Sequence, residues 1–259
     1  MSTTVPTLLH VPFSDTPQRK YTYEYVKNTI DRSQTLAFDF DTEYSGLAKG
    51  GSTNSAIQIN RQNVFMNEDY LEETLIGELV GNCSSTLFPL NLITNQFGFL
   101  KRIDKHEDII SRWDQIKPNL LLLYNSDTSL NFIHKVEGLY KSPENLLKSF
   151  QCDWFFITFF FPLYGNYGDN RIVELEYDFP ISSSNKKETY HVYMELKDVN
   201  DENGKIAIVM HGKSLQKEEN TLKGYILLNE DKTIHEIMFH FDFREYQEDI
   251  KIRIWERNN

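Results

Sequence analysis

The last third of the chain alternates apolar and polar residues over several consecutive segments, and this pattern constrains the fold more than any other feature. In "RIVELEYDF", every second residue from Val173 to Phe179 is apolar, and the residues between them are acidic. A period of two residues is typical of a β-strand that buries one face. Similar segments follow, joined by short polar turns such as "DENG" and "NEDK". Residues 171–256 are therefore predicted to form an antiparallel meander.

The first part of the chain has the same period. "KYTYEYVK" and "TLAFDFDTEY" alternate strictly, and "AIQIN" and "NVFMN" are predicted to be two further short strands. We therefore expect strands over residues 19–66, preceded by an irregular arm at residues 1–18.

The middle of the chain changes to a helical period. Leucines that recur at intervals of four predict a helix over residues 67–82, and a hairpin is predicted over residues 86–103. Residues 105–162 are predicted to form a helical block. Within it, Pro118 is expected to interrupt one helix, and Ser142 with Pro143 is a start signal for another.

Aromatic residues dominate the segment from Trp154 to Phe161. A membrane-spanning helix needs about 20 residues, so this run is too short to cross a bilayer. Asp153 stands where an N-cap is expected, and Pro162 ends the run. The segment is therefore predicted to be a short helix, buried at the centre of the fold.

These elements together predict an α+β fold. A sheet with one apolar face needs another element packed on that face, and the helical block is the candidate for that role. The predicted architecture is a curved antiparallel β-sheet, like a half-open barrel, wrapped around a central helical block. Residues 19–259 are expected to form one domain.

The composition narrows the class of partner. The chain has 38 Asp and Glu residues against 27 Lys and Arg residues, which gives a net charge of −11, and it has no run of five or more basic residues. Phosphate backbones and anionic membranes repel such a chain. We therefore expect no nucleic acid and no membrane insertion, and a protein partner with a basic surface. The N-terminus lacks the features of a signal peptide, which predicts a cytoplasmic location and leaves the oligomeric state open.

No cofactor or metal site is predicted from the common motifs. The sequence contains no P-loop, dinucleotide fingerprint or His-Glu-x-x-His pattern. Cys83 and Cys152 match no metal-binding spacing and are expected to be reduced core residues.

The segment "TLAFDFDTEYSGL" contains the first candidate site. Asp41 and Glu43 lie one residue apart at the end of a predicted strand, and the segment resembles the first motif of the DEDD-type 3′–5′ exonucleases. That resemblance implies divalent metal binding and phosphodiester hydrolysis. The alternative is that Asp41 and Glu43 belong to the solvent face of an antiparallel strand, as the acidic residues of "RIVELEYDF" do.

The segment "HEIMFHFDF" contains the second candidate. His240 and Asp242 share one face of a predicted strand and could bind a metal or form an acid–base pair. A solvated strand face is again the alternative, because no third ligand is evident.

One resemblance extends over most of the chain. "STLFPLNLITNQFGFLKRIDKHEDIISRWDQIK" and "DWFFITFFFPLYGNYG", followed by a strand-rich end, resemble a group of uncharacterised, signal-less proteins of Bacteroidetes-type bacteria. That group is loosely associated with loci for contractile secretion or injection systems. The resemblance implies an accessory role rather than a reaction.

Three functional hypotheses follow. The first is a non-catalytic protein-binding protein: an adaptor or chaperone of a secretion system, or an immunity-type protein that neutralises a basic toxin. The second is a carrier that holds a hydrophobic ligand inside a half-barrel. The third is a metal-dependent exonuclease that uses Asp41 and Glu43.

Overall fold

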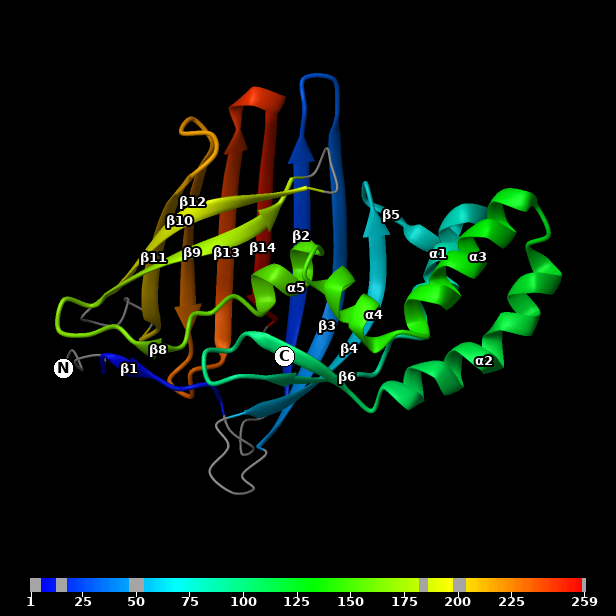
Figure 1. The fold of residues 1–259 in the computed structure, drawn as a ribbon, viewed down its shortest axis with the longest axis horizontal. Coiled ribbons are helices and arrows are strands. Elements are labelled where there is room, and N and C mark those ends of the chain that lie inside the picture. The colour runs from blue at the N-terminus through cyan, green and yellow to red at the C-terminus, as the bar shows by residue number, and fades with distance from the viewer. Residues whose placement is uncertain (1–5, 13–17, 47–53, 182–185, 198–203, 258–259) are drawn as a thin grey trace.

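The computed structural model describes residues 6–12, 18–46, 54–181, 186–197 and 204–257. Its main feature is a 12-stranded antiparallel sheet (Figure 1). The strands of this sheet are β2 (Arg19–Asn28), β3 (Ser33–Gly46), β4 (Ser55–Met66), β5 (Asp69–Tyr70), β6 (Leu90–Thr94), β7 (Leu100–Asp104), β9 (Ile172–Pro180), β10 (Lys187–Leu196), β11 (Ile206–Ser214), β12 (Thr221–Leu228), β13 (Ile234–Phe243) and β14 (Glu248–Glu256). A separate ribbon pairs β1 (Leu8–Leu9) with β8 (Gly165–Asn166).

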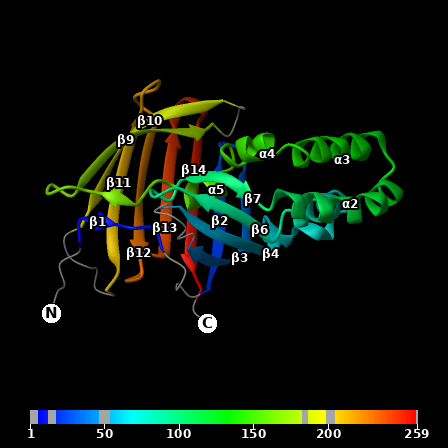
Figure 2. The same cartoon turned by 60° about the horizontal axis from the view of Figure 1, so that its bottom comes forward.

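The sheet is open, with β7 at one edge and β9 at the other. The strand order is β7-β6-β4-β3-β2-β14-β13-β12-β11-β10-β9, and β5 pairs with the outer end of β4. Strands β9 to β14 are neighbours in chain order, which confirms the predicted meander. In the middle of the sheet, β2 pairs with β14, so the two ends of the chain meet there. The sheet curves strongly around its apolar face (Figures 1 and 2).

The helices fall into two groups. The helices are α1 (Leu75–Ser85), α2 (His106–Leu123), α3 (Asp127–Tyr140), α4 (Pro143–Phe150) and α5 (Trp154–Phe159). Helices α1, α2 and α3 lie beside the β4 end of the sheet, and α5 lies against the concave face (Figures 1 and 2). The predicted central position of the helical block at residues 105–162 is therefore wrong for α2 and α3, which pack on each other and on α1: the Trp113 ring of α2 lies 5.3 Å from the Tyr140 ring of α3, and the Tyr140 hydroxyl donates to the Cys83 carbonyl of α1. None of the described helices is long and apolar enough to span a membrane.

Helix α5 fills the concave face with aromatic rings, as the sequence predicted. Asp153 caps its N-terminus, with its carboxylate accepting hydrogen bonds from the amides of Phe155 and Phe156 at 2.9 and 3.2 Å. The Phe155 ring lies 5.0 Å from the ring of Phe38 and 4.9 Å from that of Phe40, centroid to centroid. Edge-to-face contacts of this kind add to the energy of area burial. The centre of the concave face is thus packed with protein side chains.

Three local predictions are corrected by the structure. Strand β4 is continuous over the two short strands expected from the sequence, and Asn63 interrupts its pairing with a left-handed conformation at φ 48°. The helix predicted over residues 67–82 starts later, at Leu75, because the Thr74 hydroxyl accepts a hydrogen bond from the amide of Gly77. Helix α2 continues through Pro118. Proline has no amide hydrogen, so the carbonyl one turn earlier loses its helical hydrogen bond. Pro118 is exposed, and water can bind that carbonyl instead.

The cysteines differ from one another. Cys83 is buried, as expected, and its burial raises the pKa of the thiol to about 11. Cys152 is exposed in the turn between α4 and α5, so the prediction of a core residue is wrong there. The aromatic helix that follows turns inward only from Trp154, and this leaves the turn itself at the surface.

Candidate functional site

Asp41 and Glu43 lie on the convex face of β3. The residues between and beside them, Phe40, Thr42 and Tyr44, are buried, so strand alternation directs both carboxylates outward. Asp41 accepts hydrogen bonds from Gln18 Nε2 at 2.5 Å and from Asn60 Nδ2 at 3.1 Å. Amide donors occupy the carboxylate of Asp41, as on an ordinary solvated strand.

His240 and Asp242 also lie on the convex face, but they bind different partners. His240 Nε2 contacts Asp249 Oδ2 on the neighbouring strand β14, and Asp242 accepts from Arg244 Nε at 3.3 Å. Burial alone would raise the pKa of Asp249, but hydrogen bonds from His240 and Asn28 outweigh it and the pKa lies below its usual range. Within the described ranges, no group of three or more His, Cys, Asp or Glu side chains could hold a metal ion. The candidate residues are therefore not brought together into one centre.

The free edge of β9 offers a different kind of site. Backbone hydrogen bonds join Ile181 N to Lys186 O and Leu196 N to Arg171 O, so the odd-numbered residues of β9 bond to β10. Because antiparallel pairs alternate, the amides and carbonyls of the even-numbered residues point away from β10. Those residues are Glu174, Glu176 and Asp178, and all three side chains are exposed. The strand thus presents unpaired backbone groups and carboxylates at the same positions.

These carboxylates have few competing partners. Glu174 lies 3.1 Å from His191 Nε2, and Asp178 accepts from the Thr189 hydroxyl at 2.7 Å. Glu176 has no side-chain hydrogen bond or ion pair within the described part of the chain. The negative charge along this edge is therefore only partly compensated.

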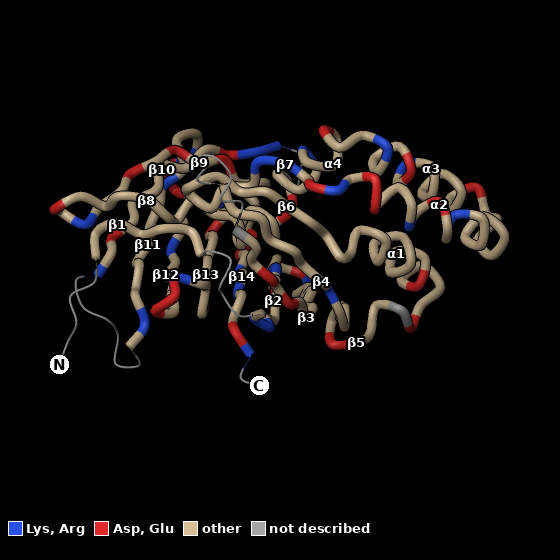
Figure 3. Tube along the Cα trace, turned by 90° about the horizontal axis from the view of Figure 1, so that it is seen from below, with Lys and Arg blue, Asp and Glu red and all other residues tan. Residues whose placement is uncertain are grey.

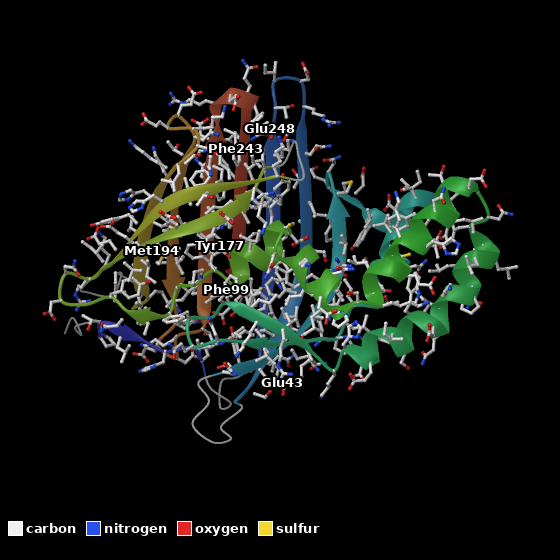
Figure 4. All side chains as sticks on the ribbon, in the orientation of Figure 1. Glu43, Phe99, Tyr177, Met194, Phe243 and Glu248 are labelled. Atoms are coloured by element: carbon white, nitrogen blue, oxygen red, sulfur yellow. The ribbon has the colours of Figure 1, made fainter. Side chains whose placement is uncertain are left out.

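A cleft of about 530 Å³ runs beside this edge. Its lining consists of Phe99, Gln151, Ile157, Glu176, Tyr177, Asp178, Lys187 and Thr189. The rings of Phe99 and Tyr177 meet edge to face at 6.4 Å and lie close together in Figure 4. The cleft is consequently apolar toward the concave face, and along the β9 edge it carries the carboxylates of Glu176 and Asp178 and one cation, Lys187.

The opposite edge of the sheet is different. Strand β7 is shorter than β9 and carries Lys101 and Arg102 as exposed residues. Along the whole trace, Lys and Arg are interspersed with Asp and Glu (Figure 3). A basic extended segment would therefore find its complementary edge at β9 rather than at β7.

Comparisons with known proteins add little to this description. No family model matches the chain, and no curated protein matches it. One solved structure, described as lipid–protein interactions in lipovitellin, is similar over 99% of this chain and 26% of that chain, with 9% sequence identity and a TM-score of 0.45. A likeness of that size carries no argument about ligand or function.

The sequence did not reveal the β9 edge as a site. The acidic alternation of β9 has a close counterpart in Asp39, Asp41 and Glu43 on β3, which is paired on both sides. Only the strand order distinguishes the two. The one sequence signal for an edge is Pro180, because proline lacks the amide that an interior strand needs.

Proposed function

We propose that this protein is a non-catalytic binding protein whose β9 edge accepts an extended segment of a basic protein partner. The observation that carries the proposal is the coincidence, along β9, of outward backbone groups with the carboxylates of Glu174, Glu176 and Asp178. Addition of a strand to a free edge is a common mode of peptide recognition, in which the main chain supplies affinity and alternate side chains supply specificity. A cytoplasmic adaptor, a chaperone for a secreted protein and an immunity-type protein all fit this mode.

The site implies a pattern in the partner. Side chains directly opposite the three carboxylates would lie on the convex face, where Lys or Arg would be attracted. The side chains between them would point toward Phe99, Ile157 and Tyr177 in the cleft, where apolar groups are favoured. The expected segment therefore alternates basic and apolar residues. In this proposal the added strand extends the curved sheet toward a half-open barrel.

The hydrophobic-carrier alternative has less support. A carrier needs space inside the curved sheet, whereas Phe155, Phe159 and Phe161 are 4%, 4% and 0% exposed and pack on the concave face. The exonuclease alternative gains no support from Asp41 and Glu43, which point outward from β3.

The test measures binding of a fluorescein-labelled peptide of alternating Lys and Val by anisotropy, at about 0.15 M salt and again at high salt. The informative variant is Glu176→Pro, which removes an outward amide and leaves the β9–β10 ladder intact. We expect Glu176→Pro to weaken binding by at least about tenfold, since it loses a main-chain hydrogen bond and a charge.

The matched control is Glu219→Gln, in the exposed turn before β12, which changes the net charge by the same +1 as Glu176→Pro without touching the edge. Circular dichroism and the unfolding midpoint verify that each variant folds. Two results would contradict the proposal. In one, a peptide of the same composition in scrambled order binds equally well; in the other, Glu176→Pro binds as the parent protein does.

A further inference from the structure

A second cleft, also of about 530 Å³, lies where β4 faces β5 and the C-terminal end of α1. Strand β4 pairs with β6 as far as Ile59 and with β5 from Phe65, so residues 60–64 have a strand neighbour only on the β3 side. The gap opens directly onto the cleft. Its walls include the apolar side chains of Val64, Leu71 and Phe88.

Arg61 is the cation of this cleft. Its guanidinium carbon lies 4.8 Å from the ring centre of Phe88 and 5.6 Å from that of Phe38. Its Nη2 donates to Ser84 Oγ at 2.5 Å. A guanidinium has five N–H donors, so most of them find no acceptor within the described part of the chain. Burial lowers the pKa of Arg61, and the neighbouring Tyr140 and Asp153 only partly oppose that effect.

No carboxylate within the described ranges lies within 4.0 Å of the Arg61 guanidinium. Asp41 also lines the cleft, but it follows Phe40, the residue directly opposite Arg61, so its side chain starts from the face of the sheet that carries Gln62, across from Arg61. The negative charge of Asp41 is moreover engaged by two amide donors. The cleft therefore combines an apolar wall with a partly buried cation that has no ion pair within 4.0 Å among the described residues, although the protein as a whole carries a charge of −11.

We propose that this cleft binds a small organic anion, a carboxylate joined to an apolar body. Arg61 would bind the two carboxylate oxygens through its planar fork of N–H donors, which matches that geometry. Val64, Leu71 and Phe88 would contact the apolar body. This site is separate from the β9 edge and does not depend on the function proposed for that edge.

The test titrates benzoate into the protein at constant ionic strength and follows the thermal unfolding midpoint, with benzyl alcohol as the uncharged analogue. A ligand that binds the folded state raises the midpoint in a saturable way. We expect this rise with benzoate and not with benzyl alcohol. Arg61→Met keeps an apolar chain between the two rings and removes the charge, and it should weaken benzoate binding by at least about tenfold. Arg253→Met, on an exposed arginine of β14, is the matched control and should leave binding unchanged.

Gln62 provides a second pair of variants, and these do not require the fold to accept a replacement of the partly buried Arg61. It is exposed and lines the cleft. Gln62→Glu should weaken benzoate binding and Gln62→Lys should strengthen it, each by about threefold or more, through the charge alone. The proposal is overturned by the absence of a saturable rise, by an equal rise with benzyl alcohol, or by benzoate binding that Arg61→Met leaves intact.

Discussion

Replacement of Phe155 by alanine tests whether the concave face is packed as the structure describes. Phe155 is 4% exposed, and its ring lies 5.4, 5.0 and 4.9 Å from the rings of Tyr23, Phe38 and Phe40. Truncation of a buried Phe to Ala costs about 3–5 kcal/mol of unfolding free energy. Loss of three edge-to-face contacts places this site in the upper part of that range. The better helix propensity of alanine offsets only about 0.5 kcal/mol.

We therefore expect Phe155→Ala to lower the free energy of unfolding by about 4 kcal/mol, which for a chain of this size lowers the unfolding midpoint by about 8–16 °C. Urea unfolding followed by circular dichroism measures the first quantity, and differential scanning calorimetry measures the second. The control is Leu122→Ala on α2, where the side chain is 79% exposed and the expected change is below about 0.5 kcal/mol.

A loss below about 1.5 kcal/mol for Phe155→Ala would refute the reasoning, because a closely packed ring cannot be removed so cheaply. That outcome would mean that the interior is loosely filled and that α5 can be displaced. It would revive the hydrophobic-carrier hypothesis. A second measurement bears on the same point: benzene should raise the midpoint of Phe155→Ala by entering the new cavity, and should leave the parent protein unchanged.

Three other predictions concern charge and space in the fold. Hydrogen bonds from Lys117 and Lys141 hold the pKa of Glu137 at about 2, so Glu137→Gln should cost about 1 kcal/mol at pH 7. Because that pKa is depressed, the difference in unfolding free energy between Glu137→Gln and the parent protein should be fully present above about pH 4.3, the usual Glu value, and should disappear as the pH falls toward about 2. Urea unfolding at a series of pH values measures this difference. Glu188 is 2% exposed, its carboxylate accepts two hydrogen bonds from Asn220 Nδ2, and no cation of the described residues lies within 4.0 Å of it. Glu188→Gln should therefore change the free energy of unfolding by less than about 1 kcal/mol. Glu188→Ala should lower it by about 1–3 kcal/mol, because it leaves Asn220 unpaired. A Cβ on Gly224 in β12 would stand 2.6 Å from the Met238 carbonyl oxygen, whereas one on Gly138 in α3 meets no atom within 4 Å. Gly224→Ala should therefore lower the free energy of unfolding by about 1–3 kcal/mol, and Gly138→Ala should raise it by up to about 1 kcal/mol. The opposite order would contradict the close approach of β13 to Gly224.

The elements that the sequence predicted well are those with strong local signals. Alternation marked β2, β3 and the meander β9–β14, and Ser142 with Pro143 marked the start of α4. The hairpin predicted over residues 86–103 is present as β6 and β7, and its turn is closed by the carbonyl of Asn95, which accepts from the amide of Gly98 at 3.0 Å. Each of these features depends on a few residues that are neighbours in the sequence, so the conformational preferences of those residues are enough to predict it.

Features that depend on distant contacts were not predicted. The position of α1–α3 beside β4 follows from which apolar faces meet, and helical periodicity does not specify that. Continuation of α2 through Pro118 depends on the exposure of that residue, which only the folded chain determines. The β9 edge depends on strand order. The role proposed for Arg61 depends on the gap in pairing along β4, and the four polar residues and one valine at positions 60–64 gave no distinctive signal for that gap.

The pairing of β2 with β14 places a constraint on the order of events during synthesis. Tyr23 lies opposite Ile254, and Tyr21 opposite Glu256, so the centre of the sheet joins two strands that the ribosome makes more than 200 residues apart. Until β14 is made, the long strand β2 has an unpaired, aromatic-rich edge, and such edges promote aggregation. Non-local pairing of this kind also slows folding. The nascent chain is thus vulnerable until β14 pairs with β2, and a variant that lacks β14 should accumulate as aggregate rather than as a smaller folded protein.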